Sequence, residues 1–107
     1  MKKFAFIMIS PFFDPEKNRA IFTAEGRESH IYYAKDYEDA KKLIVDLYHD
    51  GFRGIELCSA FGREKTRELM ELTDNKMAIG YIVFDPENAE AYQEFFGREL
   101  AETITGK

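Results

Sequence analysis

The stretch Gly54-Ile55-Glu56-Leu57-Cys58-Ser59-Ala60-Phe61-Gly62 joins a short apolar run to a turn of small residues. We interpret it as the end of a buried strand over 52–58, followed by a tight loop and a helix over 63–73. Before it, apolar residues at helical spacing predict a helix over 36–49. After it, an apolar run predicts a strand over 77–84. Strands and helices therefore alternate on both sides of the stretch.

The rest of the chain extends this alternation. Residues 4–9 form a continuous apolar run, which is typical of a central parallel strand covered on both faces. Residues 29–34 are rich in types that favour strands. Asp-Pro pairs at 14–15 and 85–86 have the pattern of helix starts, with aspartate as the N-cap and proline in the first helical position. They predict a short helix over 14–22 and a last helix after the second pair.

This order predicts a single α/β domain over residues 1–107. Its sheet would be small, open, mainly parallel and four-stranded, with helices on both faces. Residues 29–84 fit two consecutive βαβ units of about 30 residues each. The alternative is a ferredoxin-like α+β sandwich, which would need antiparallel pairing. Residues 98–107 are interpreted as a polar C-terminal tail.

Composition limits the classes of partner. The formal net charge is −5, and lysine and arginine are scattered rather than gathered in a basic block. A nucleic-acid surface needs such a block to displace counterions, so we expect no nucleic-acid partner. No apolar run reaches the length of a membrane span, so we expect no membrane insertion. The ten Phe and six Tyr exceed the needs of a small core, and we expect a homo-oligomer.

The cysteine count bears on the compartment. One cysteine cannot form an internal disulfide, which fits a reducing compartment, and we expect a cytoplasmic protein. The spacing of His, Cys, Asp and Glu does not match a metal site. The loop over 59–62 has one glycine and no following Lys-Ser or Lys-Thr, so it is not a P-loop. We therefore expect neither a metal nor a cofactor.

The fold class predicts where a ligand would bind. Open parallel sheets bind ligands beyond the carboxyl ends of their strands, where helix N-termini also attract anions. The sequence therefore favours a small anionic ligand at this edge. The candidate binding residues follow the ends of the predicted strands: Ser10, Lys35, Ser59, Gly62, Arg63 and Asp85.

Two residues of the central stretch are candidates for chemistry. Glu56 lies in a strand predicted to be covered on both faces, where a carboxyl group removed from water can act as a general base. The alternative is a Glu56 that pairs with a cation or faces water. Cys58 lies near a helix N-terminus, which favours a thiolate nucleophile. The alternative is a small buried apolar residue. His30 and His49 are interpreted as structural or exposed.

The chain also resembles an uncharacterised family of small α/β proteins that is catalogued as a domain of unknown function. The resemblance spans residues 4–85, and Glu56-Leu57-Cys58 followed by Phe61-Gly62 is its most specific part. The family pattern tends to have two glycines before Phe-Gly and a histidine after it. This chain has Ser59, Ala60 and Arg63 at those places, so the histidine's proton-transfer group is absent. The other matching segments are 5–11, 14–17, 19–20, 35–38, 54–55 and 80–85.

Three functions follow as hypotheses. The first is a module that binds a small anionic metabolite at the strand ends. The second is a small lyase, isomerase or hydrolase that uses Glu56 and Cys58. The third is an interaction protein whose task is self-assembly, because surplus aromatic residues could cover the edges of a short sheet. The resemblance implies no substrate for any of them.

Overall fold

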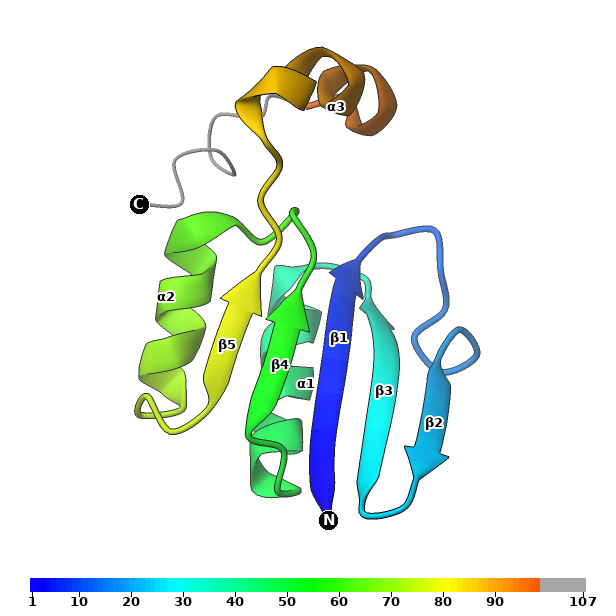
Figure 1. Ribbon diagram of the computed structural model, residues 1–107, viewed down its shortest axis with the longest axis vertical. Coiled ribbons are helices and arrows are strands. Elements are labelled where there is room, and N and C mark those ends of the chain that lie inside the picture. Colours follow the sequence, from blue (N-terminus) through cyan, green and yellow to red (C-terminus); the bar gives the residue numbers. More distant parts are fainter. Residues whose placement is uncertain (99–107) are drawn as a thin grey trace.

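The computed structural model describes residues 1–98 and contains a five-stranded sheet and three α-helices (Figure 1). Of the predicted polar tail, only Arg98 is among the described residues. The elements, in chain order, are β1 (Lys2–Ile9), β2 (Ala20–Ala24), β3 (Arg27–Ala34), α1 (Tyr37–His49), β4 (Gly54–Leu57), α2 (Gly62–Leu72), β5 (Ala78–Tyr81), the short 3-10 helix η1 (Pro86–Asn88) and α3 (Ala89–Phe96).

The sheet is mixed and mostly parallel. Its strand order is β2-β3-β1-β4-β5. β1 pairs in parallel with both β3 and β4, β4 pairs in parallel with β5, and only the β2–β3 pair is antiparallel. The predicted α/β class is therefore confirmed, and the ferredoxin-like alternative is wrong because it required antiparallel pairing throughout. The predicted strand number of four is also wrong.

The additional strand is β2, which replaces part of the helix predicted over 14–22. Asp14 does cap a turn, since its Oδ1 accepts a hydrogen bond from the N–H of Glu16 at 2.9 Å. The turn does not continue, because the branched and aromatic residues Ile21-Phe22-Thr23 favour a strand. Gly26, with φ +78°, closes the hairpin to β3 in a conformation that glycine adopts without strain.

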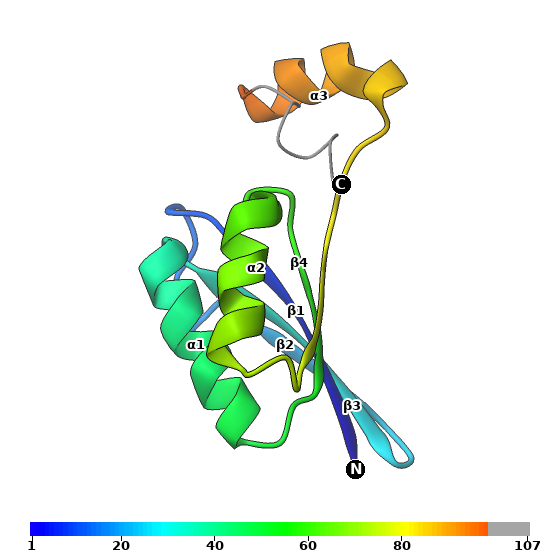
Figure 2. The ribbon, with the colours of Figure 1, turned by 90° about the vertical axis from the view of Figure 1, so that its left-hand side faces the viewer.

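Both long helices lie on the same face of the sheet, so the prediction of helices on both faces is wrong (Figure 2). The β3–α1–β4 and β4–α2–β5 connections step in the same direction along the sheet. Right-handed crossovers that step in one direction place their helices on one face. The connection that steps in the other direction, from β1 to β3, carries the strand β2 instead of a helix. The second face, called the open face below, therefore has no helix from residues 1–98.

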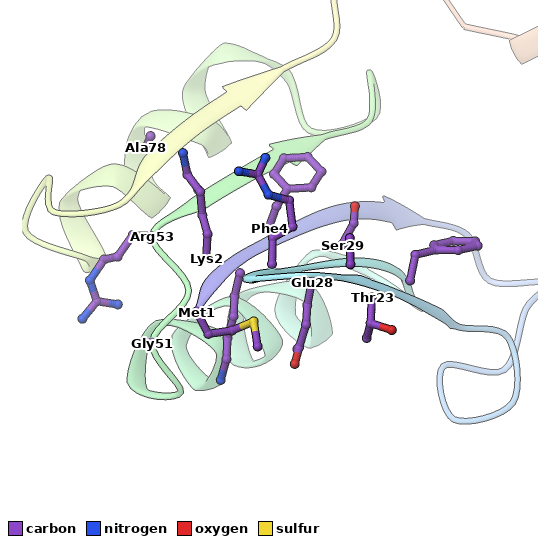
Figure 3. A pocket seen from close by; sticks show the side chains of 14 residues that line it. Met1, Lys2, Phe4, Thr23, Glu28, Ser29, Gly51, Arg53 and Ala78 are labelled. Carbon is purple, nitrogen blue, oxygen red and sulfur yellow. The ribbon is translucent and has the colours of Figure 1, made fainter.

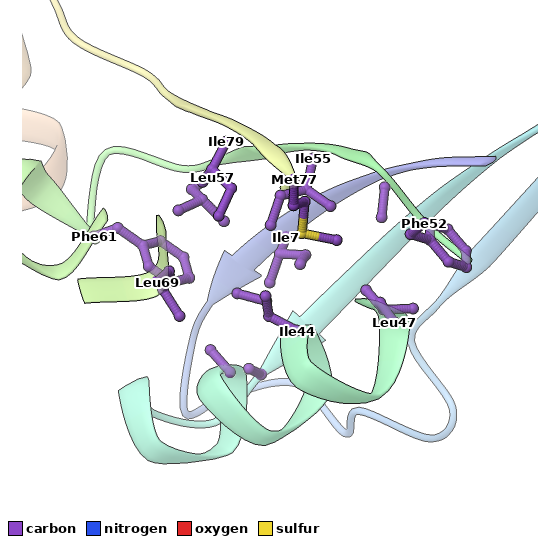
Figure 4. Close-up of a cluster of buried hydrophobic side chains, with 13 residues drawn as sticks. Ile7, Ile44, Leu47, Phe52, Ile55, Leu57, Phe61, Leu69, Met77 and Ile79 are labelled. Carbon is purple, nitrogen blue, oxygen red and sulfur yellow. The ribbon is translucent and has the colours of Figure 1, made fainter. Parts of the chain in front are cut away.

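The core lies between the sheet and the two helices (Figure 4). Ile7 of β1 and Leu57 of β4 are fully buried and point toward Ile44 of α1 and Leu69 of α2. Alternate residues of the same strands face the other way, because side chains alternate along a strand. The helices therefore cover only one half of each apolar strand.

The predicted ends of helix α1 are confirmed. The Oδ1 of Asp36 accepts a hydrogen bond from the N–H of Asp39 at 2.8 Å, which caps the helix at its N-terminus. Gly51 follows the helix with φ +96°, a left-handed conformation that favours glycine. Among residues 1–98, no helix has the length and apolar character needed to cross a membrane.

Replacing Ile7 by alanine tests the position of the core. Ile7 is fully buried at the centre of the sheet, so the cavity left by Ile7→Ala should lower the free energy of unfolding by about 2–5 kcal/mol. The matched control is Ile21→Ala on the edge strand β2, where the side chain is 53% exposed and the loss should stay below about 1 kcal/mol. Urea denaturation measures both changes. Equal losses would contradict the assigned core.

Candidate functional site

Four of the residues predicted to form a site lie together where β4 leads into α2. Cys58 and Ser59 follow the strand, and Gly62 and Arg63 begin the helix. The N–H of Phe61 donates to the carbonyl oxygen of Cys58 at 3.2 Å, which closes the turn. Gly62 has φ +71°, so the close turn into the helix depends on a glycine. This segment is called the β4–α2 turn below.

The N-terminus of α2 is buried and lacks a side-chain cap. Phe61 occupies the N-cap position, where its ring cannot accept a hydrogen bond, and Phe61 is only 2% exposed. Within residues 1–98, no side chain accepts a hydrogen bond from the N–H of Gly62, Arg63 or Glu64. The first N–H groups of a helix have no partner inside it and normally bond to a cap, water or a ligand.

Arg98 brings a positive charge to this turn. Its Nη2 donates to the Oγ of Ser59 at 3.1 Å, and its Nε donates to the hydroxyl oxygen of Tyr92 at 3.0 Å. Ser59 is buried, with 6% of its surface exposed. Because Ser59 accepts from Arg98, its hydroxyl hydrogen is free to point at another acceptor. Sequence reasoning missed Arg98, which lies 39 residues from Ser59 in the chain and reaches it only through the fold.

The other predicted binding residues make no hydrogen bond to this turn within residues 1–98. Ser10 follows β1, and its Oγ accepts from the N–H of Phe12 at 3.3 Å. Asp85 lies on the segment beyond β5 and caps η1 by accepting from the N–H of Glu87 at 2.8 Å. Lys35 lines a shallow pocket of about 620 Å³ that it shares with five carboxylate residues and one other lysine. That negative surrounding disfavours an anion beside Lys35.

Glu56 and Cys58 lie in different environments. Glu56 is exposed on the open face, so the prediction of a carboxylate buried between two covered faces is wrong, and the alternative of a Glu56 that faces water agrees with the structure. In register it lies between Phe6 of β1 and Gly80 of β5. Cys58 is a free, half-buried thiol that packs against the hydrophobic core. The sequence could not reveal the exposure of Glu56, because it depends on the face to which the helices return.

His30 belongs to a hydrogen-bonded row on the helix-covered face of β3. Its Nε2 lies 2.9 Å from the Oε1 of Glu28, and its Nδ1 lies 2.7 Å from the hydroxyl oxygen of Tyr32. The ring of Phe52 packs edge-on against the imidazole, with 5.0 Å between the ring centres. Burial raises the pKa of Tyr32, which therefore stays neutral. This row satisfies buried polar groups, so His30 has the structural role that was predicted for it.

A groove of about 860 Å³ lies at the other end of the sheet, where the strands begin (Figure 3). Lys2, Phe4 and Ser29 rise from the open face, whereas Thr23 and Glu28 point to the helix-covered side. The groove is thus far from the strand ends where the fold class predicts a ligand. We treat it as a part of the open face, because most of its lining comes from residues that alternate toward that face.

These features define a small α/β protein with a mixed, mostly parallel sheet, one open face, and a polar turn at the carboxyl end of β4. The chain belongs to DUF6506, a family of unknown function, whose model matches residues 2–97. The predicted resemblance to an uncharacterised family is therefore confirmed. No curated protein and no solved structure matches the chain. Among the described residues, no group of three or more His, Cys, Asp or Glu side chains could hold a metal ion.

Tyr37 links the helix α1 to α2 beside this site, and it generates a prediction on pH. Its hydroxyl donates to a carboxylate oxygen of Glu68, and the same hydroxyl oxygen lies 3.3 Å from the carbonyl oxygen of Lys65. Burial, the hydrogen bond to Glu68 and the charge of that carboxylate raise the pKa of Tyr37 above its ordinary value. The unfolded chain then releases the proton first, so stability should be complete below about pH 10 and fall as the pH rises further.

The measurement is the free energy of unfolding against pH, by urea denaturation. Tyr37→Phe should flatten the decline above about pH 10, because the titrating hydroxyl is removed. Glu68→Gln keeps the tyrosine, removes the carboxylate, and should flatten the decline in part. A Tyr37→Phe variant with the wild-type decline would contradict the assignment.

Proposed function

We propose that this protein binds a small anionic metabolite at the β4–α2 turn. The observation that carries the proposal is the buried, uncapped N-terminus of α2 beside the guanidinium of Arg98. Such an N-terminus offers N–H groups and a partial positive charge, which together suit a carboxylate or a phosphate. The ligand would take the place that an Asp or Ser side chain holds at an ordinary N-cap.

A comparison with two other helix starts of this chain supports the proposal. Asp36 caps α1 and Asp85 caps η1, each through its own carboxylate, whereas α3, like α2, has no side-chain cap. At α2 the corresponding residue is Phe61, and Arg63 and Arg98 lie nearby instead of an acid cap. Ser59 adds a hydroxyl group that can donate to the same anion. A bound anion would therefore meet backbone N–H groups, one hydroxyl and two cations.

The enzyme and homo-oligomer hypotheses do not rest on the uncapped N-terminus of α2. The enzyme hypothesis relied on a desolvated Glu56, and the exposed side chain does not provide that condition. The homo-oligomer hypothesis concerned the edges of the sheet and does not involve the β4–α2 turn. We place the protein in the cytoplasm, because a single cysteine fits a reducing compartment.

Thermal unfolding in the presence of anions tests the proposed site. Inorganic phosphate, sulfate and malonate are the probes, each compared with sodium chloride at equal ionic strength. A ligand at ten times its Kd stabilises a protein by about 1.4 kcal/mol, which should raise Tm by roughly 5–10 °C in a domain of this size. At least one probe should give such a shift.

Substitutions at the β4–α2 turn test whether the shift in Tm comes from an anion bound there. Arg98→Gln and Ser59→Ala should each reduce the shift, because one removes a cation and the other a hydroxyl donor. The matched control is Arg67→Gln, an exposed arginine further along α2, which should keep the full shift. If no probe exceeds chloride, or if Arg98→Gln responds like the control, the proposed site is wrong.

A further inference from the structure

The open face is apolar, and among residues 1–98 no helix covers it; the ring of Phe13 stacks on Tyr33 at one end, with 4.4 Å between the ring centres. Phe4, Phe6 and Met8 of β1 alternate toward this face, and Ile31 and Tyr33 of β3 lie beside them in register. Phe22 of the edge strand continues the surface and is 61% exposed. Parallel strands are normally covered on both faces, and large exposed apolar surfaces mark interaction sites. β1 therefore has the composition of a strand that is covered on both faces. Residues 1–98 supply the helical layer on one face only.

The charges on this face are arranged in a self-complementary way. Glu56 lies at the level of Phe6, with which it pairs in register. Lys2 lies four residues before Phe6 on the neighbouring strand, about 13 Å away along the strand at roughly 3.3 Å per residue. Arg27 pairs with Lys2 in register and adds a second cation at that level. Within residues 1–98, none of the three takes part in an ion pair.

We infer that a second copy of this chain packs on the open face, with its strands running in the opposite direction. The two-fold axis would cross the strands at the level of Phe4, midway between the levels of Lys2 and Glu56. Glu56 of β4 would then lie at the level of Lys2 of the partner subunit and one strand to the side, about 4.8 Å, within reach of the long lysine side chain, and symmetry would form the same pair twice. The Phe4 rings of the two copies would meet near the axis. This inference does not depend on the proposed anion site.

The size of the face suits such a dimer. The sheet has five strands about 4.8 Å apart, and β1 has eight residues, so the face measures about 19 by 26 Å. Two such faces would bury on the order of 1,000 Å², which is about the lower limit for a specific interface. A partner surface that carries charges of one sign would attract either Glu56 or the two cations Lys2 and Arg27, and would repel the others. A second copy of this chain carries both signs at the same spacing, so it can attract all three.

The experiment measures the dimer dissociation constant of the full chain by sedimentation equilibrium. Glu56→Lys places like charges opposite each other and should weaken the dimer roughly tenfold or more. Lys2→Glu should weaken it for the same reason. The double variant that carries both changes restores opposite charges and should regain most of the wild-type affinity. Glu71→Lys, which makes the same charge change on an exposed site of α2, should have little effect.

Circular dichroism on each variant establishes that the fold is intact. Loss of the dimer in each single variant and its recovery in the double variant would establish the interface and its orientation. A wild-type chain that stays monomeric at high concentration would overturn the inference. A dimer that is equally stable in Glu56→Lys and in wild type would also overturn it, because the interface would then lie elsewhere.

Discussion

The handedness of the two helical crossovers is the constraint on which this structure depends. From β3 to β4 and from β4 to β5 the chain steps in one direction, so α1 and α2 must return over the same face. The single step in the other direction, from β1 to β3, carries the edge strand β2. Within residues 1–98, helices therefore cover one face of the sheet and no helix covers the other. The exposure of Glu56, the groove at the start of β1 and the exposed Phe22 all follow from that asymmetry.

The sequence could predict the elements whose signals are local. The helix over 36–49 has its stripe, its aspartate cap and its glycine, and the strand before Ser59 has an apolar run between turns. The short helix after Asp14 was predicted wrongly, because an aspartate cap looks the same before one turn as before several. The strand-forming run Ile21-Phe22-Thr23 was the signal that could have corrected it. Which faces of the sheet are covered by helices could not be predicted from local sequence, since it depends on the order of the strands.

The candidate site shows the same division. Ser59, Gly62 and Arg63 could be predicted because a turn from a strand into a helix has a recognisable composition, and the structure brings these three together. Arg98 could not be predicted, because no local pattern links a residue after α3 to the carboxyl end of β4. Lys35 follows β3 and Asp85 lies after β5, so both were predicted by the same rule. Their surroundings are set by neighbours distant in sequence, five carboxylates in one case and the N–H of a helical turn in the other.

The proposed dimer gives Glu56 a role in selecting the partner surface instead of a role in catalysis. A carboxylate on an apolar sheet face costs little while water reaches it, but a covering layer that offers no cation would leave it as an uncompensated buried charge. It therefore discriminates among the layers that could cover the face, and it disfavours a slipped register of any layer that does fit. Apolar residues such as Phe4 and Phe6 supply attraction without direction. The charge at Glu56 and the cations at Lys2 and Arg27 supply the direction, because only one orientation of a second sheet brings opposite charges together.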